Sequence, residues 1–245
     1  MAADTSYDAV IIGAGHNGLA AAIHLAKHGW SVGVFEAKGE PGGAVKTREL
    51  TLPGFRHDIA AMNLSMFAGS PFLKEHAAAL GRHGLAFAPA AHCFASVFPD
   101  ETGVGVSKDL ETTLQRLNLI NPKDAAAWSA MLARFGKDAP HIFGLLGNVM
   151  PSLAAAKVVW KAWRENGTGW TLDMLRFLTM PTRVWADAHF EDPKVKATLA
   201  AWGMHLDFPP DIAGGALFPY LESMADQAFG MVIGKGGSDM MIRSM

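Results

Sequence analysis

The sequence predicts an α/β fold in which a βαβ unit with a glycine-rich turn precedes a largely helical region. Three observations carry this prediction: an apolar run over 9–12, a glycine-rich turn over 13–18, and a second apolar run that ends on an acid, Glu36. A helical pattern rich in Ala and Leu over 17–28 joins the two runs and stops at Gly29. This order of elements is typical of parallel strands joined by a helix.

The turn reads Gly13-Ala14-Gly15-His16-Asn17-Gly18, which is the glycine fingerprint of a dinucleotide site. In that motif Gly13 permits the turn, Gly15 lets a pyrophosphate approach the backbone, and Gly18 lets the helix pack closely on the sheet. The start of the helix offers unpaired N–H groups to phosphates. Glu36 lies 21 residues after Gly15, where its carboxylate can accept ribose hydroxyls. The sequence therefore predicts a Rossmann-like dinucleotide-binding domain.

The residues after Glu36 favour FAD, with NAD(P) as the alternative nucleotide. Gly42 and Gly43 follow the acid with Glu-x5-Gly-Gly spacing, which resembles the extended fingerprint of FAD-dependent oxidoreductases. Lys46 and Arg48 can offset phosphate charge, although solvated surface positions explain them as well. We expect cofactor contacts from both loops and from the strand end, at Gly13, Gly15, His16, Asn17, Gly18, Glu36, Ala37, Gly42, Gly43 and Ala44.

The start of the chain, over 7–44, together with residues 52–58 and 98–124, resembles the phytoene desaturase-like flavoproteins. The letters GAGHNGL resemble, more narrowly, the branch of pyridine nucleotide-disulfide oxidoreductase domain-containing and phytoene dehydrogenase-related proteins. The resemblance implies the fold of the flavin amine oxidases, bound FAD, and an apolar substrate in a cavity that faces the flavin ring.

Members of that family are much longer than this chain, and in them a loop like Gly236-Gly237 stands near the middle of the protein. We therefore expect a fragment, or one subunit of a split flavoenzyme that a second polypeptide completes. A compact protein that needs only this half is the third and least favoured alternative. The expected domains are the N-terminal portion of an FAD-binding domain over 1–106, a mostly helical substrate domain over 107–232, and the start of a return segment over 233–245.

Composition agrees with an apolar substrate or a missing packing partner. Hydrophobic residues make up 50% of the chain and charged residues 18%, against about 25% charged in typical proteins. The net charge of −2, without a basic run, argues against nucleic-acid binding. One cysteine, Cys93, excludes an internal disulfide and a CxxC centre within this chain, and its apolar neighbours predict a buried structural thiol.

The segment over residues 1–6 is short and polar, which predicts no targeting segment and a cytoplasmic protein. The apolar stretch from His141 to Trp163 has two interpretations. It is either a buried or partner-covered helix pair, which we favour, or a peripheral contact with a membrane. Only His141, Lys157 and Lys161 offer that stretch a polar face.

The rest of the chain predicts a hairpin-like passage over 52–57, a helix near 72–80, and short strands near 86, 94–98 and 104–106. Ser107 is expected to cap one helix, and Asn121-Pro122 is expected to open the next. The remainder reads as helical, broken at Pro151, Gly167, Pro181, Pro193 and Pro209-Pro210.

Tryptophans and methionines are frequent in the helical region and can line a cavity for a flexible apolar ligand, although ordinary core positions also explain them. They are Trp160, Trp163, Trp170, Trp185, Trp202, Met150, Met174, Met180 and Met204.

The sequence identifies neither a catalytic residue nor a metal cluster. Asp187 and His189 are spaced as a carboxylate–imidazole pair, but a solvated helix end is the preferred interpretation. Asp58 is expected to hold its loop by hydrogen bonds. A lack of catalytic side chains suits flavin chemistry, because the cofactor accepts the electrons.

We therefore expect an FAD-dependent oxidoreductase that desaturates, dehydrogenates or isomerises an apolar substrate, and that needs a complementary half. The alternatives are a non-catalytic flavin- or nucleotide-binding subunit and a flavin amine oxidase.

Overall fold

The computed structural model describes residues 6–245, which form two compact units. The first unit combines residues up to 90 with residues 231–245, and the second comprises residues 91–230. The sequence placed the domain boundaries after residues 106 and 232, and that domain assignment remains a prediction. The predicted absence of a targeting segment concerns residues 1–6, of which 1–5 lie outside the described residues.

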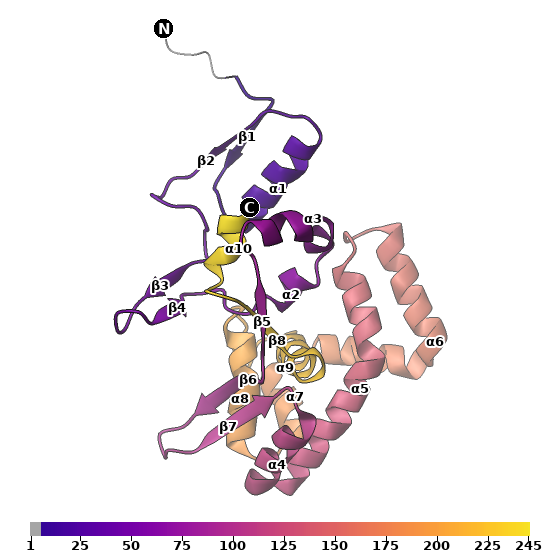
Figure 1. Ribbon diagram of the computed structural model, residues 1–245. Coiled ribbons are helices and arrows are strands. Elements are labelled where there is room, and N and C mark those ends of the chain that lie inside the picture. Colours follow the sequence, from indigo (N-terminus) through magenta and orange to yellow (C-terminus); the bar gives the residue numbers. More distant parts are fainter. Residues whose placement is uncertain (1–5) are drawn as a thin grey trace. The chain divides into compact units, whose positions relative to one another are not determined.

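The first unit begins with the expected βαβ arrangement. Strand β1 (Ala9–Ile12) pairs in parallel with β2 (Val32–Phe35), and α1 (His16–Lys27) contacts both strands (Figure 1). The helix ends where the sequence indicated, because Gly29 adopts a positive φ of 86°. The backbone N–H of Gly29 donates to the Ala26 carbonyl, which is one of the carbonyls left unpaired at a helix end.

The rest of the first unit packs around a small apolar core. Its antiparallel pairs join β3 to β4 and β5 to β8, so the last fifteen residues return to the unit that holds the glycine loop. The core residues are Val45, Leu64, Leu80, Leu85, Met241 and Ile242. The elements are β3 (Thr47–Glu49), β4 (Arg56–Asp58), α2 (Ser65–Ala68), α3 (Pro71–Arg82), β5 (Phe87–Ala90), β8 (Met231–Gly234) and α10 (Asp239–Ser244).

The second unit opens with an antiparallel hairpin of β6 (His92–Val97) and β7 (Gly103–Ser107), followed by α4 (Leu110–Ile120). The prediction that Ser107 caps α4 is wrong. Ser107 is still paired within the hairpin, and the cap is Asp109, whose carboxylate accepts a hydrogen bond from the Thr112 N–H at 2.9 Å.

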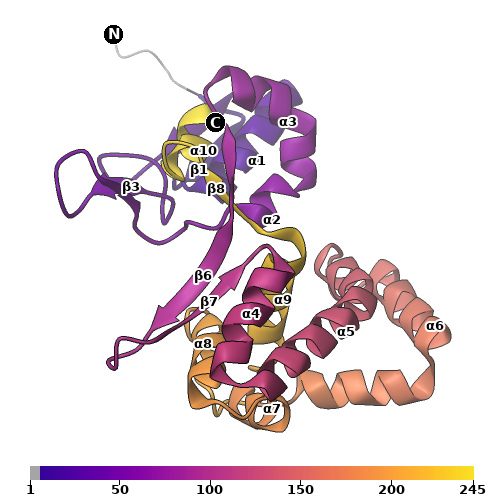
Figure 2. The ribbon, with the colours of Figure 1, turned by 60° about the horizontal axis from the view of Figure 1, so that its bottom comes forward.

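Helices make up the rest of the second unit, and they break where the sequence predicts. Pro193 is the first residue of α8, and Gly167 bends α6 with a φ of 82° and a ψ of 175°. Figure 2 shows α6 as two rods that meet at this bend. Among the described residues, no helix has both the length and the apolar character needed to cross a membrane. The helices are α5 (Pro122–Leu146), α6 (Leu153–Leu178), α7 (Thr182–His189), α8 (Pro193–Met204) and α9 (Leu217–Phe229).

Candidate functional site

The two glycine loops of the first unit lie against each other at the carboxyl ends of β1 and β2. The Gly13 N–H donates to the Phe35 carbonyl at 2.7 Å, and the Gly42 N–H donates to the Ala14 carbonyl at 2.8 Å. Gly15 and Gly42 also pair as an isolated parallel bridge. Two loops that are separated by more than twenty residues of sequence therefore form one site. We call this site, made by the loops over 13–18 and 42–43, the cradle.

The glycines of the two loops differ in how strongly the protein itself excludes a side chain. A Cβ on Gly18 would stand 2.2 Å from the Gly13 carbonyl oxygen, so Gly18 permits the close packing of α1 on the loop. A Cβ on Gly43 would lie 3.4 Å from the Gly15 Cα, and one on Gly15 would lie 3.9 Å from the Gly43 Cα. Gly13, Gly42 and Gly43 have φ values of 97°, 127° and 58°, which disfavour any side chain.

The first turn of α1 presents its N–H groups without a side-chain cap. Gly15 occupies the cap position in an extended conformation, and neither a capping hydrogen bond nor an acidic residue occurs in that turn. His16 and Asn17 are exposed. Because helix N-termini carry a partial positive charge and unpaired donors, this end of α1 suits an anion such as a diphosphate.

Glu36 is fixed beside this helix end by backbone donors. Its carboxylate accepts hydrogen bonds from the Ala14 N–H at 2.7 Å and from the Lys38 N–H at 2.9 Å. Hydrogen bonds from Lys38 first, and then from Ala14, lower the pKa of Glu36 from its usual 4.5. The carboxylate therefore stays ionised and oriented, as an acceptor for ribose hydroxyls must be.

Two basic residues near the cradle are neutralised within the unit. Lys46 lies 3.3 Å from the Glu40 carboxylate, and Arg48 pairs with the same carboxylate. Ala37 and Ala44, which the sequence assigned to the cofactor site, are exposed beside the two loops. The ten predicted residues thus gather at one end of the first unit, and their contact with a cofactor remains a prediction.

Asp58 holds its loop, which agrees with the sequence expectation. Its Oδ1 accepts hydrogen bonds from the Thr47 hydroxyl at 2.6 Å, from the Ser238 N–H at 2.9 Å and from the Ser238 hydroxyl at 3.0 Å. Sequence reasoning missed the partner Ser238, which lies 180 residues away. No local pattern signals that contact.

The second unit contains an apolar cavity of about 330 Å³ between the end of α5, both halves of α6, and the start of α9. Met150, Trp170 and Met174 line it, as the Met- and Trp-rich composition allowed. Trp185 lies in the core at 3% exposure, whereas Trp160 and Trp163 are about half exposed. The cavity therefore uses only part of the predicted set.

Two further sequence expectations are decided by direct contacts. Asp187 pairs with Lys196 at 2.7 Å and His189 bonds the Trp185 carbonyl, so Asp187 and His189 do not form a pair with each other. Cys93 is buried, with its sulfur 3.5 Å from the Asp226 carbonyl oxygen, which confirms a structural thiol. The described residues contain no His, Cys, Asp or Glu cluster able to hold a metal ion.

Comparison with known proteins assigns the start of the chain. Residues 11–80 match the family model of the NAD(P)-binding Rossmann-like domain. Over 118 residues the chain is 35% identical to one of the subunits of limonene dehydrogenase from Castellaniella defragrans, an alignment that covers 48% of this chain and 21% of that protein. It is 30% identical over 215 residues to pyridine nucleotide-disulfide oxidoreductase domain-containing protein 2 of Rattus norvegicus, covering 79% of this chain and 36% of that protein.

Among solved structures, an oxidoreductase from Methanosarcina mazei superimposes with a TM-score of 0.52 at 18% identity, over 96% of this chain and 47% of that chain. This likeness shows a shared fold. The chain thus spans less than half the length of each relative to which it is compared. It carries an NAD(P)-binding Rossmann-like domain and is homologous to parts of larger oxidoreductases, which confirms the resemblance to the phytoene desaturase-like proteins and their pyridine nucleotide-disulfide oxidoreductase domain-containing branch.

Proposed function

We propose that this chain supplies the FAD-binding part of a flavin-dependent oxidoreductase that acts on an apolar substrate. The observation that carries the proposal is the cradle of Gly15, Gly42 and Gly43 beside the ionised Glu36. The uncapped N–H groups of α1 suit a diphosphate, and the Glu36 carboxylate suits ribose hydroxyls. When bound, the flavin supplies the redox chemistry of desaturation, dehydrogenation or isomerisation. The chain itself binds and orients the adenosine and diphosphate end.

The apolar substrate class is supported by the cavity of the second unit. Its walls come from aliphatic, Met and Trp side chains, such as Met150, Leu175 and Trp170. Ligand sites are lined mainly by such side chains, and thioethers adapt to flexible hydrocarbon. A cytoplasmic location and a peripheral contact with a membrane remain predictions. The contact would use the exposed Leu153 and Trp160 of α6. It would give the protein access to an apolar substrate.

A second polypeptide as partner is supported by the β1–β2 pair. Val10, Ile12 and Phe35 of this two-stranded parallel sheet are 58%, 89% and 53% exposed. Parallel sheets are normally covered on both faces and contain more strands, because βαβ crossovers place helices on each side. We therefore propose that a complementary polypeptide adds strands or covers this face.

The cofactor proposal is tested by the visible spectrum of the purified chain, alone and mixed with the polypeptide encoded beside it. A yellow complex that is bleached by an apolar substrate under anaerobic conditions is the expected result. Nicotinamide dinucleotide bound in place of flavin would overturn the FAD assignment. Flavin that is bound but that no candidate substrate reduces would favour a non-catalytic binding subunit.

The partner proposal is tested by replacing one exposed residue. Ile12→Glu places a charge on the exposed sheet face and should abolish association with the complementary polypeptide in size-exclusion chromatography. Leu119→Glu is the matched control, because Leu119 of the second unit is also 89% exposed. Equal association of the two variants would contradict the assignment of this face.

A further inference from the structure

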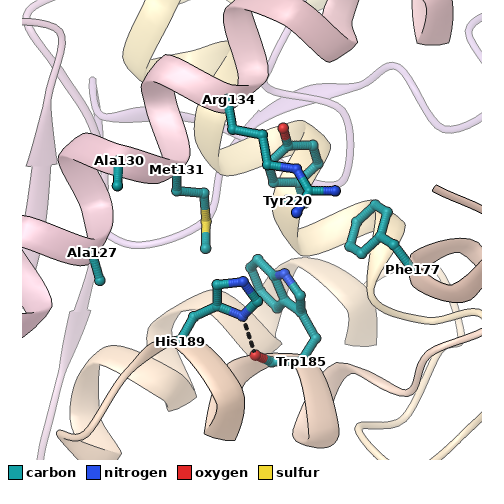
Figure 3. A pocket seen from close by; sticks show the side chains of 8 residues that line it. All are labelled: Ala127, Ala130, Met131, Arg134, Phe177, Trp185, His189 and Tyr220. Carbon is teal, nitrogen blue, oxygen red and sulfur yellow. Dashed lines mark hydrogen bonds between the residues drawn. The ribbon is translucent and has the colours of Figure 1, made fainter. Parts of the chain in front are cut away.

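The second unit contains another pocket, of about 250 Å³, which the proposed nucleotide chemistry does not use. Four helices contribute to it, namely α5, α6, α7 and α9 (Figure 3). Phe177, Trp185 and Tyr220 form an aromatic wall, and Arg134 and His189 add two basic side chains. An aromatic wall with a single guanidinium is an arrangement that can select a ligand by charge and shape together.

Arg134 is held in position by a buried acid. Its Nε donates to Oδ2 of Asp138 at 3.2 Å, and the Asp138 side chain is 1% exposed. Asp138 also accepts hydrogen bonds from the Tyr220 hydroxyl at 2.9 Å and from the Trp170 indole N–H at 2.9 Å. The carboxylate is therefore satisfied by three donors, and it fixes one edge of the guanidinium.

The other edge of Arg134 is open. Its two terminal amino groups have no hydrogen-bond partner among residues 6–245, and 43% of the side chain is exposed. The guanidinium carbon lies 5.9 Å from the centre of the Phe177 ring. Asp138 thus holds Nε of the guanidinium, and the Phe177 ring lies near it. The terminal amino groups keep a pair of N–H donors for a ligand.

The aromatic wall is rigid. The ring centres of Phe177 and Tyr220 are 5.2 Å apart, and Trp185 lies 6.4 Å from Phe177 and 6.3 Å from Tyr220. All three side chains are nearly buried, at 6%, 3% and 2% exposure for Phe177, Trp185 and Tyr220. The pairs of Tyr220 with Phe177 and with Trp185 are edge-to-face, and the Phe177–Trp185 pair is tilted. The three rings support one another, so the wall is formed before a ligand arrives.

Two further polar groups of the pocket are engaged within the protein. The Tyr220 hydroxyl donates to Asp138, and burial first, then the charge of Asp138, raises the pKa of Tyr220. The His189 Nδ1 lies 2.8 Å from the Trp185 carbonyl, to which it must donate (Figure 3). That contact engages His189 Nδ1 within the protein. Arg134 offers the pocket a guanidinium with an open edge of N–H donors.

We propose that this pocket binds a small apolar monocarboxylate. The carboxylate receives a forked pair of hydrogen bonds from the open edge of Arg134, and the apolar body lies against Phe177, Trp185 and Tyr220. The guanidinium fork matches the planar geometry of a carboxylate, and it repels cations. An apolar cavity of about 150 Å³ holds a benzene ring, so the size of this pocket suits one ring with its carboxylate. Asp138 holds Nε of Arg134, so the open edge of the guanidinium presents its N–H pair in a fixed orientation.

Titration calorimetry of the full 245-residue chain with benzoate and benzamide tests the ligand class. The two probes have the same size, but only benzoate carries a charge. We expect saturable benzoate binding that is at least tenfold tighter than benzamide binding. Two results overturn the proposal: equal binding of both probes, and no saturation by benzoate up to about 20 mM. Weak millimolar binding is detected in that concentration range. This measurement is made without flavin, so its failure leaves the cofactor proposal untouched.

Three variants locate the site. Ala130→Leu fills the pocket from α5, whereas Ala133→Leu makes the same change at an exposed position of α5 that does not line it. We expect Ala130→Leu to weaken benzoate binding at least tenfold and Ala133→Leu to change it less than twofold. Arg134→Lys keeps the charge but loses the fork, and we expect a similar tenfold loss. Unchanged binding in both Ala130→Leu and Arg134→Lys overturns the site. If either variant fails to fold by circular dichroism, the other still decides.

Discussion

Replacing Gly15 by Ala separates a role in binding from a role in folding. The backbone at Gly15 has a φ of −75° and a ψ of 171°, which any residue adopts, and the nearest heavy atom to an added Cβ is 3.9 Å away. The protein alone therefore accepts the methyl group. A bound diphosphate does not, because the methyl group occupies the space through which phosphate oxygens reach the N–H groups of α1.

The magnitude follows from the hydrogen bonds that are lost. A hydrogen bond to a charged group contributes about 1.5–3 kcal/mol, so the loss of one such bond weakens dinucleotide binding about ten- to hundredfold. Stability should change in the opposite direction. Replacing Gly by Ala at a compatible position stabilises a protein by about 0.4–1 kcal/mol, because it restricts the unfolded chain.

Two assays check this prediction. Urea unfolding measures the free energy of unfolding, and flavin fluorescence titration measures FAD affinity. Gly81→Ala is the matched control, because an added Cβ there meets nothing within 4 Å and Gly81 lies in α3, away from the cradle. FAD affinity unchanged in Gly15→Ala would refute the cradle as the diphosphate site. A destabilised Gly15→Ala protein would refute the geometric reasoning itself.

Three other changes have defined outcomes. The folded-state pKa of Glu36 lies below its usual 4.5, so the stabilising contribution of Glu36 is present above about pH 4.5 and is lost as the pH falls through the folded value. Glu36→Gln should therefore flatten the acid side of a plot of the urea unfolding midpoint against pH. An unchanged slope on that side would contradict this. Asp58→Ala removes the acceptor of three hydrogen bonds and should cost about 1–3 kcal/mol in urea unfolding; a loss under 0.5 kcal/mol would speak against a structural role. Gly167→Ala forces a side chain into a φ of 82° and should cost about 1–3 kcal/mol in thermal unfolding, whereas Gly169→Ala, in the same helix with open space around it, should be neutral or stabilising.

The nucleotide end of the fold was predictable because its determinants are local. The turn after β1, the helix stop at Gly29 and the acid after β2 each act through backbone conformation within a few residues. The break at Gly167 and the start of α8 at Pro193 were readable for the same reason. The cap of α4 was misassigned, since Ser107 and Asp109 are both good caps and only the extent of the hairpin decides between them.

Contacts between residues far apart in the sequence could not be predicted from local patterns. Asp58 meets Ser238 across 180 residues, and β5 pairs with β8 although the whole second unit lies between them in the chain. The spacing of Arg134 and Asp138 on one helix face was visible in the sequence. Their neighbour Tyr220, which lies 82 residues beyond Asp138, was not.

The sequence by itself determined the βαβ start, the glycine loop and the acid that faces it, because glycine conformation and strand–helix periodicity are properties of short segments. Only the tertiary structure brought Gly42 against Gly15 and ordered the carboxylate of Glu36 with two backbone donors. It alone assembled the pocket of Arg134 from four helices. The physical reason is that such sites depend on which apolar faces pack together, and packing is decided by the whole core.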